Sequence, residues 1–245
     1  MDSAPRMTGQ ATKRFPKRFW TSATLVESNG RWGISLDGRA LTTPARATLS
    51  LPNRALGEEI AAEWNQCGDE LDPSAMPLTG LANAAVDHVT PDPDRFAADI
   101  ARYAEGDLLC YRADVPPSLL AAQSASWNPL LEWARQRFKI DFALASGIIH
   151  IPQPATTVTK LRETVSILDP FHLTALAPIV TISGSLVAAL ALNERAFPVE
   201  TLWNAVSLDD RWQLEKWGAD AEAVAALDAR RRDFLAAAHF LDLLD

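Results

Sequence analysis

The chain has 245 residues, of which 48% are hydrophobic and 22% are charged, and its formal net charge is −8. This composition is typical of a globular protein with one large or two modest cores, and the negative charge argues against a nucleic acid partner, whose phosphates require a basic surface. The two cysteines, Cys67 and Cys110, are too few for a disulfide framework, and we expect both to be reduced.

Residues 1–17 are predicted to form a flexible basic arm. The segment contains Arg6, Lys13 and Arg14 but no apolar run, so it is not a secretory signal. A short arm without a clear transit peptide favours a bacterial cytoplasmic protein. The alternative is the remnant of a mitochondrial address, which would place the protein in the mitochondrial matrix.

Residues 18–91 predict an N-terminal α/β domain that begins with a β-meander. From Phe19 to Leu51 the residues alternate and are rich in Thr, Val, Ile and Trp. Asn29-Gly30 and Asp37-Gly38 occupy hairpin positions, because these pairs tolerate the positive φ of tight primed turns. We therefore expect strands joined by two short turns.

Two helices are expected after the strands. The first begins at Pro52, which a first helical turn accepts, and is closed by Gly68. The second covers residues 78–89. The segment from Thr90 to Asp94 then breaks the pattern, and we place a domain boundary after residue 91.

Residues 92–245 predict a mainly helical domain, an orthogonal bundle, so the fold class is α+β. Residues 140–151 look extended, and pairing of this segment with the N-terminal sheet is one alternative. Pro129 is expected to bend or divide a helix. The expected helices are 93–106, capped by Asp92, then 117–138, 157–168, 170–177, 185–192, 198–217 and 222–244.

Common catalytic and binding motifs are missing from the sequence. There is no GxxxxGK[ST], GxGxxG or GxSxG pattern, and the four histidines lack metal-ligand spacing. We therefore expect no cofactor and no metal. The span 173–192 is the best candidate for a membrane helix, but Pro178 and the Ser183-Gly184-Ser185 segment interrupt it, so we expect no membrane insertion.

The segment from Ser207 to Gly218 is the most unusual part of the chain. If one helix runs unbroken from Val199, Asp210 and Gln213 fall inside its apolar stripe and Asp209 falls at the edge. A carboxylate in such a place must find a cation, accept backbone hydrogen bonds or stay protonated. A structural polar cluster and a functional site both fit this pattern, with Asp210 as the structural anchor and Asp209 better placed for solvent or a partner. The predicted stripe contains Leu202, Trp203, Val206, Leu214 and Trp217.

The chain has eight tryptophans, a residue that fills cores but is also enriched at protein interfaces. Trp212 lies on the face opposite the stripe, and we expect it to contact a partner. The alternative is that Trp212 packs under the C-terminal helix.

Many short motifs, in order along nearly the whole chain after the arm, resemble one known family. They are Arg18-Phe19-Trp20, Leu36-Asp37-Gly38-Arg39, Leu41-Thr42-Thr43-Pro44, Ala61-Ala62-Glu63-Trp64, Met76-Pro77-Leu78-Thr79, Tyr103, Asp107-Leu108-Leu109-Cys110-Tyr111-Arg112, Gln123, Trp127-Asn128-Pro129-Leu130, Ser185-Leu186-Val187 and the segment from Ser207 to Gly218. Together they resemble the assembly chaperones of the F-type ATP synthase that bind its alpha subunit, the mitochondrial ATP synthase assembly factor 2 family and its alphaproteobacterial relatives.

The resemblance implies a chaperone that is not an enzyme, requires no nucleotide and binds the unassembled alpha subunit until beta replaces it. It assigns the partner-binding motif to Asp209, Asp210, Trp212, Gln213 and Trp217, with one of the two aspartates in the family's acidic position. The structural motif residues that it implies are Trp20, Asp37, Gly38, Pro44, Trp64, Pro77, Tyr103, Asp107, Tyr111 and Trp127. An enzyme of unfamiliar fold that uses Asp209, Asp210 and Glu215, and a permanent subunit of a larger complex, are the alternatives.

Overall fold

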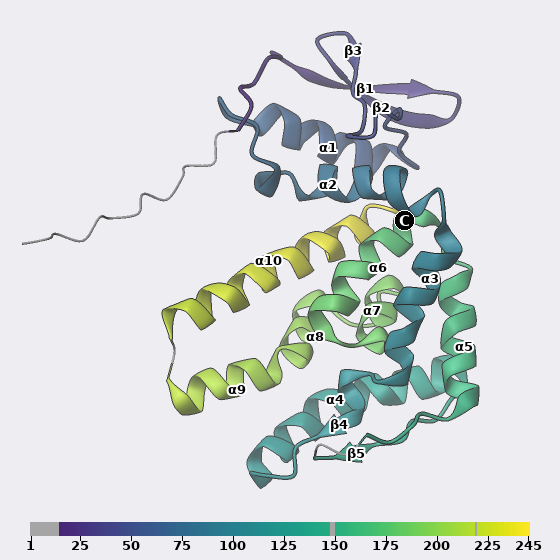
Figure 1. The fold of residues 1–245 in the computed structure, drawn as a ribbon, viewed down its shortest axis with the longest axis vertical. Coiled ribbons are helices and arrows are strands. Elements are labelled where there is room, and N and C mark those ends of the chain that lie inside the picture. Colours follow the sequence, from purple (N-terminus) through teal and green to yellow (C-terminus); the bar gives the residue numbers. More distant parts are fainter. Residues whose placement is uncertain (1–14, 148–149, 219) are drawn as a thin grey trace, which may run out of the picture.

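An antiparallel sheet forms one end of the molecule in the computed structural model, which describes residues 15–147, 150–218 and 220–245 (Figure 1). Its strands are β1 (Ala23–Ser28), β2 (Arg31–Leu36) and β3 (Arg39–Ala40), in that order. The residues of both connecting turns have positive φ, 53° and 72° at Asn29-Gly30 and 47° and 86° at Asp37-Gly38. This is the geometry of primed hairpin turns, so the predicted β-meander is confirmed.

Two helices lie against the sheet. Helix α1 (Arg54–Gln66) begins after Asn53, whose side chain accepts a hydrogen bond from the Leu56 amide at 2.9 Å. The expectation that Pro52 occupies the first turn is therefore wrong, because Asn53 supplies the cap. Helix α2 (Pro77–Ala84) follows a short 3₁₀ turn, η1 (Pro73–Ala75), and continues as a π-helical turn, η2 (Ala85–Val89).

Glu63 joins these two helices. Its carboxylate accepts hydrogen bonds from the backbone amides of Leu78 and Thr79, both at 2.8 Å, at the start of α2. Burial raises the pKa of Glu63, while these hydrogen bonds act in the opposite direction. The α1 side chain thus supplies the cap that α2 lacks in its own sequence.

The rest of the described chain is mainly helical, so the α+β prediction is confirmed. Helices α6 and α7 lie at the centre, and α7 is buried along nearly its whole length. Helices α3, α4, α8 and α10 pack against them, and α5 packs on the outer side of α3 (Figure 1). The elements are α3 (Pro93–Ala101), η3 (Arg102–Glu105), η4 (Leu108–Cys110), β4 (Tyr111–Arg112), α4 (Pro117–Phe138), β5 (Ala145–Ser146), α5 (Ala155–Ser166), α6 (Pro170–Ser183), α7 (Leu186–Asn193), α8 (Val199–Val206), α9 (Leu208–Trp217) and α10 (Ala221–Asp242).

Several predicted elements differ from the structure. Strand β5 pairs in parallel with β4, not with the N-terminal sheet. Pro129 does not divide α4, and α6 continues past Pro178 to Ser183. The helix expected over 198–217 is broken at Ser207. None of the described helices is long and apolar enough to cross a membrane.

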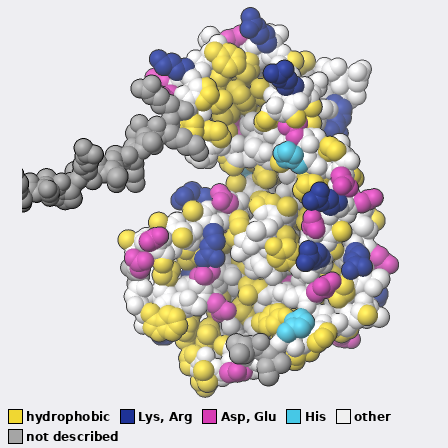
Figure 2. Space-filling view, viewed as in Figure 1, with side chains coloured by type: hydrophobic (Ala, Val, Ile, Leu, Met, Phe, Trp, Pro, Cys, Tyr) yellow, Lys and Arg dark blue, Asp and Glu magenta, His cyan; other side chains and the backbone are white. Residues whose placement is uncertain are grey.

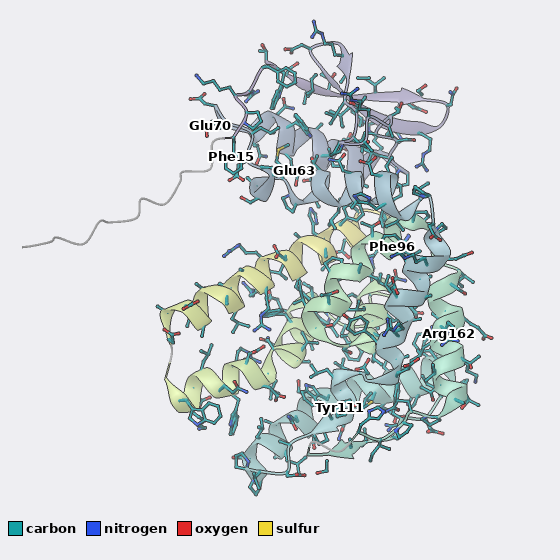
Figure 3. The ribbon with its side chains drawn as sticks, in the orientation of Figure 1. Phe15, Glu63, Glu70, Phe96, Tyr111 and Arg162 are labelled. Atoms are coloured by element: carbon teal, nitrogen blue, oxygen red, sulfur yellow. The ribbon has the colours of Figure 1, made fainter. Side chains whose placement is uncertain are left out.

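The two predicted domains share a packed interface, since α2 and η2 contact α6 and α10. The boundary after residue 91 stays a prediction. Of the predicted arm, residues 1–14 lie outside the described residues. Its last part is not free, because the Pro16 carbonyl accepts a hydrogen bond from the Leu71 amide at 2.8 Å and Lys17 forms a β-bridge with Glu70. Figure 3 labels Phe15 and Glu70 at the end of the molecule that holds the N-terminal sheet.

A buried carboxylate links η4 to α7. Asp107 has no exposed surface, and its Oδ1 accepts a hydrogen bond from the Leu109 amide at 3.0 Å while Oδ2 accepts one from the Val187 amide at 2.9 Å. Burial raises the pKa of Asp107 to about 6, although the hydrogen bonds from the helix starts oppose this shift. Asp107 therefore fixes the start of the Tyr111–Arg112 strand relative to the central helix.

We predict that Asp107→Ala strongly destabilises the fold. The substitution leaves two buried amides without an acceptor, and each such loss costs roughly 1–3 kcal/mol. Urea unfolding should show a free energy of unfolding lower by about 2–5 kcal/mol. Asp228→Ala, which removes an exposed carboxylate of α10, is the matched control. Equal stability of the two variants would contradict the role of Asp107.

A histidine at the start of α6 lies between two carboxylates. His172 Nδ1 is 2.5 Å from Asp169 Oδ2, and His172 Nε2 is 3.7 Å from Asp245 Oδ1. The hydrogen bond with Asp169 raises the pKa of His172. Because the folded-state pKa exceeds the unfolded value of about 6.5, the stabilisation is complete below that pH and is lost as the pH rises through the folded pKa.

We therefore expect the advantage in unfolding free energy of the wild type over His172→Gln to fall as the pH rises above about 6.5. Denaturant unfolding at several pH values measures this difference. His239→Gln, at an exposed position of α10, is the control. An advantage that grows with pH would contradict the assignment.

Candidate functional site

A surface hollow of about 370 Å³ lies between α9, the start of α4 and the segment that follows β4. We call it the α9 hollow. Its lining includes Tyr111, Arg112, Val115, Pro116, Leu119, Gln123, Asp209, Trp212, Gln213 and Trp217. Four of the five residues predicted for partner binding thus share one hollow with Tyr111 from the structural motif.

A chain of hydrogen bonds crosses the floor of this hollow. Gln123 on α4 is almost completely buried. Its Nε2 donates to Asp209 Oδ1 at 2.9 Å, and its Oε1 accepts from the Ala113 amide at 2.8 Å. Both ends of the Gln123 amide are therefore used, and they tie the first turn of α9 to α4 and to the segment after β4.

Asp210 points to a different neighbour. Its Oδ2 forms a salt bridge of 2.9 Å with Arg230 Nη2 on α10, and both side chains are roughly two-fifths exposed. The expectation that Asp210 is the buried anchor is therefore wrong. Asp209, expected at the rim, makes the contact with the buried amide.

The reason for this correction is a helix break at Ser207. Its hydroxyl donates to the Trp203 carbonyl at 2.7 Å, which also accepts from the Ser207 amide at 3.0 Å, and the hydroxyl accepts from Arg211 Nε at 3.2 Å. Such bonding of a serine side chain back to the preceding turn bends helices. The apolar stripe of α8 does not continue into α9, where none of the residues is buried. Leu202, Trp203 and Val206 are buried as expected, but Trp217 is 82% exposed.

Arg112 is a site residue that the predicted partner-binding and structural motif residues do not include. Its Nη2 donates to Asn128 Oδ1 at 2.9 Å, and its guanidinium lies 5.0 Å from the centre of the Trp127 ring. Burial lowers the pKa of Arg112, and the negative charge of Asp209 acts in the opposite direction. Trp127 in turn donates its indole N–H to the Ala205 carbonyl at 2.8 Å, which connects α4 to α8. The sequence feature that indicates Arg112 is its position directly after Tyr111, one of the predicted structural motif residues.

Apolar side chains surround these polar groups at the surface. Val115 is 76% exposed, Trp217 is still more exposed, and Trp212 is half-buried with Lys216 Nζ 5.0 Å from its ring centre. Figure 2 shows hydrophobic side chains at the surface of the end of the molecule that holds α4 and α9. Exposed aromatic and aliphatic groups around a few fixed polar groups are typical of a protein interface.

The remaining motif residues lie in other parts of the fold. Trp20 and Trp64 pack in the N-terminal core with ring centres 4.8 Å apart, and Trp20 Nε1 donates to the Trp64 carbonyl at 3.1 Å. Asp37 and Gly38 form the β2–β3 turn, where the Asp37 carboxylate accepts from the amides of Thr21 and Ser22, which lower its pKa. The other members are Pro44 in an exposed loop, Pro77 at the start of α2, and Tyr103 in η3.

The described residues contain no group of three or more His, Cys, Asp or Glu side chains that could hold a metal ion. Near the α9 hollow, the Tyr111 hydroxyl lies 2.7 Å from His150 Nδ1. The geometry thus consists of hydrogen-bonded anchors and exposed apolar groups, which suits recognition of another macromolecule.

Three comparisons with known proteins agree on one family. The family model for the ATP12 chaperone protein matches residues 17–135. The crystal structure of Atp12 from Paracoccus denitrificans is similar with 39% identity and a TM-score of 0.89, covering 94% of this chain and 98% of that one. The mitochondrial protein atp12 of Schizosaccharomyces pombe is 24% identical over 219 residues, 84% of this chain and 75% of that protein.

The exposure of α9 gives a direct stability prediction. Trp217→Ala removes a ring that is almost free in solvent, so we expect the free energy of unfolding to change by less than about 0.5 kcal/mol. Trp203→Ala empties a buried site on α8 and should cost about 3–5 kcal/mol. Urea unfolding of both variants measures the contrast. A large loss of unfolding free energy for Trp217→Ala would contradict the structure and favour a continuous apolar stripe through α8 and α9.

Proposed function

Because the chain belongs to the ATP12 chaperone family, we propose that it is an assembly chaperone of the F-type ATP synthase that binds the unassembled alpha subunit. The observation that carries the proposal is the α9 hollow, where exposed Trp217 and Val115 surround the hydrogen-bonded pair of Gln123 and Asp209. Such a surface can bind a client protein without any chemical step.

The physical task is to cover an apolar surface. An alpha subunit that has not yet joined beta exposes the area that the two will share, and such patches promote aggregation or wrong pairing. A chaperone that binds this area lowers the concentration of the free, aggregation-prone subunit by mass action. Release requires no nucleotide if beta binds the same area more tightly.

Asp209 and Asp210 have different parts in this proposal. Asp209 holds α9 on Gln123, so it positions Trp212 and Trp217 for the client. Asp210 pairs with Arg230 and braces the opposite side of α9. We assign the motif's acidic role to Asp209, because its carboxylate is the one that lines the α9 hollow.

The two alternatives, an enzyme and a permanent subunit of a larger complex, predict different experimental results. An enzyme that uses Asp209, Asp210 and Glu215 should stay folded and lose turnover when either aspartate is replaced by Ala. A permanent subunit should co-purify with the finished ATP synthase, from which a chaperone is absent. We favour the chaperone, and a bacterial cytoplasmic location over the mitochondrial matrix.

We predict selective capture of the alpha subunit by the immobilised protein when alpha and beta are offered separately. The double variant Trp212→Ala/Trp217→Ala should capture alpha at least about tenfold more weakly, because aromatic anchors dominate interface energies. It should also fail to suppress the light scattering of aggregating alpha. Phe19→Ala removes an exposed aromatic ring at the other end of the molecule and is the matched control. Equal capture of alpha and beta, or ATP turnover by the pure protein, would refute the proposal.

A further inference from the structure

A second hollow, of about 620 Å³, lies where α3 and η3 pack against α6. We call it the α3 hollow. Ile100 and Val180 form its buried floor, and the half-buried rings of Phe96 and Tyr103 form its apolar walls. The α3 hollow and the α9 hollow share no lining residue, although Gly106 of the first lies beside the Tyr111 hydroxyl of the second.

The rim of the α3 hollow carries charges without partners. Asp99 and Glu105 are exposed, and in the part of the chain that the structure describes neither side chain forms a hydrogen bond or a salt bridge. Arg102, between them in sequence, is also without an ion pair there. The Tyr103 hydroxyl likewise has no hydrogen-bond partner among these residues. The hollow therefore offers two carboxylates and one guanidinium around an apolar floor.

These groups define the chemistry of an occupant. A large apolar side chain would cover Ile100 and Val180, and a Lys or Arg beside it would reach the carboxylates of Asp99 and Glu105. An acidic group would meet two carboxylates against one guanidinium, so the balance of charge disfavours it. The volume lies within the range of ordinary ligand sites, large enough for one or two side chains.

We propose that the α3 hollow binds a peptide segment of a partner protein in which Lys or Arg lies next to a large apolar residue. On a helical segment, these residues would stand three or four positions apart and so share one face. The Tyr103 hydroxyl then supplies a hydrogen bond to the segment. The proposal does not depend on which protein is the client at the α9 hollow.

The test uses the full chain and a fluorescein-labelled, Ala-based helical peptide of about twelve residues that carries Leu and Arg on one face. We expect saturable binding, followed by fluorescence anisotropy, that weakens as NaCl is added. The double variant Asp99→Asn/Glu105→Gln should bind at least about tenfold more weakly. Asp228→Asn and Trp212→Ala, both outside the α3 hollow, should bind the peptide like the wild type. Thermal melting confirms that each variant is folded.

Three results would overturn the proposal. One is the absence of binding up to about 1 mM peptide, a concentration that detects even weak contacts. Another is equal or tighter binding of a peptide with Glu in place of Arg. The third is unchanged peptide binding by Asp99→Asn/Glu105→Gln together with loss of peptide binding by Trp212→Ala. That result would indicate that the peptide binds the α9 hollow.

Discussion

The buried carboxylate of Asp107 is the contact on which the candidate site depends. It accepts amide hydrogen bonds from the start of η4 and from the start of α7, the central helix. The chain that leaves η4 is β4, and the segment after it supplies Ala113 and Val115 to the α9 hollow. A single side chain without contact to the hollow thereby sets the position of one of its walls relative to the core.

Polar contacts, not apolar burial, hold α9 in place. Gln123 binds Asp209 on one side, and Arg230 binds Asp210 on the other. Since Trp217 is 82% exposed, it contributes little to folding, and Trp212 is only half-buried. Their apolar area therefore remains available to a partner, which is the physical basis of the proposed chaperone function. Because polar contacts hold α9 and its exposed aromatic rings do not, the site can present these rings on a stable fold.

Local chemistry predicted much of the fold but not the arrangement of the site. Asn29-Gly30 and Asp37-Gly38 determine their turns through backbone preferences of their own, and Asp92 caps α3 through its own side chain, accepting from the Arg95 amide. The break at Ser207 coincides with side-chain hydrogen bonds to Trp203 and from Arg211, and a periodicity argument that assumes one helix cannot detect it. Asp209 and Gln123 are 86 residues apart, so only the tertiary fold reveals their contact.

Amide hydrogen exchange of the full chain, alone and with separately purified alpha subunit, tests the central claim most directly. If the α9 hollow holds the client, exchange should slow in residues 113–119 and 208–217 while the strands β1 and β2 remain unchanged. Protection confined to the N-terminal sheet, or no protection at saturating alpha subunit, would contradict the claim.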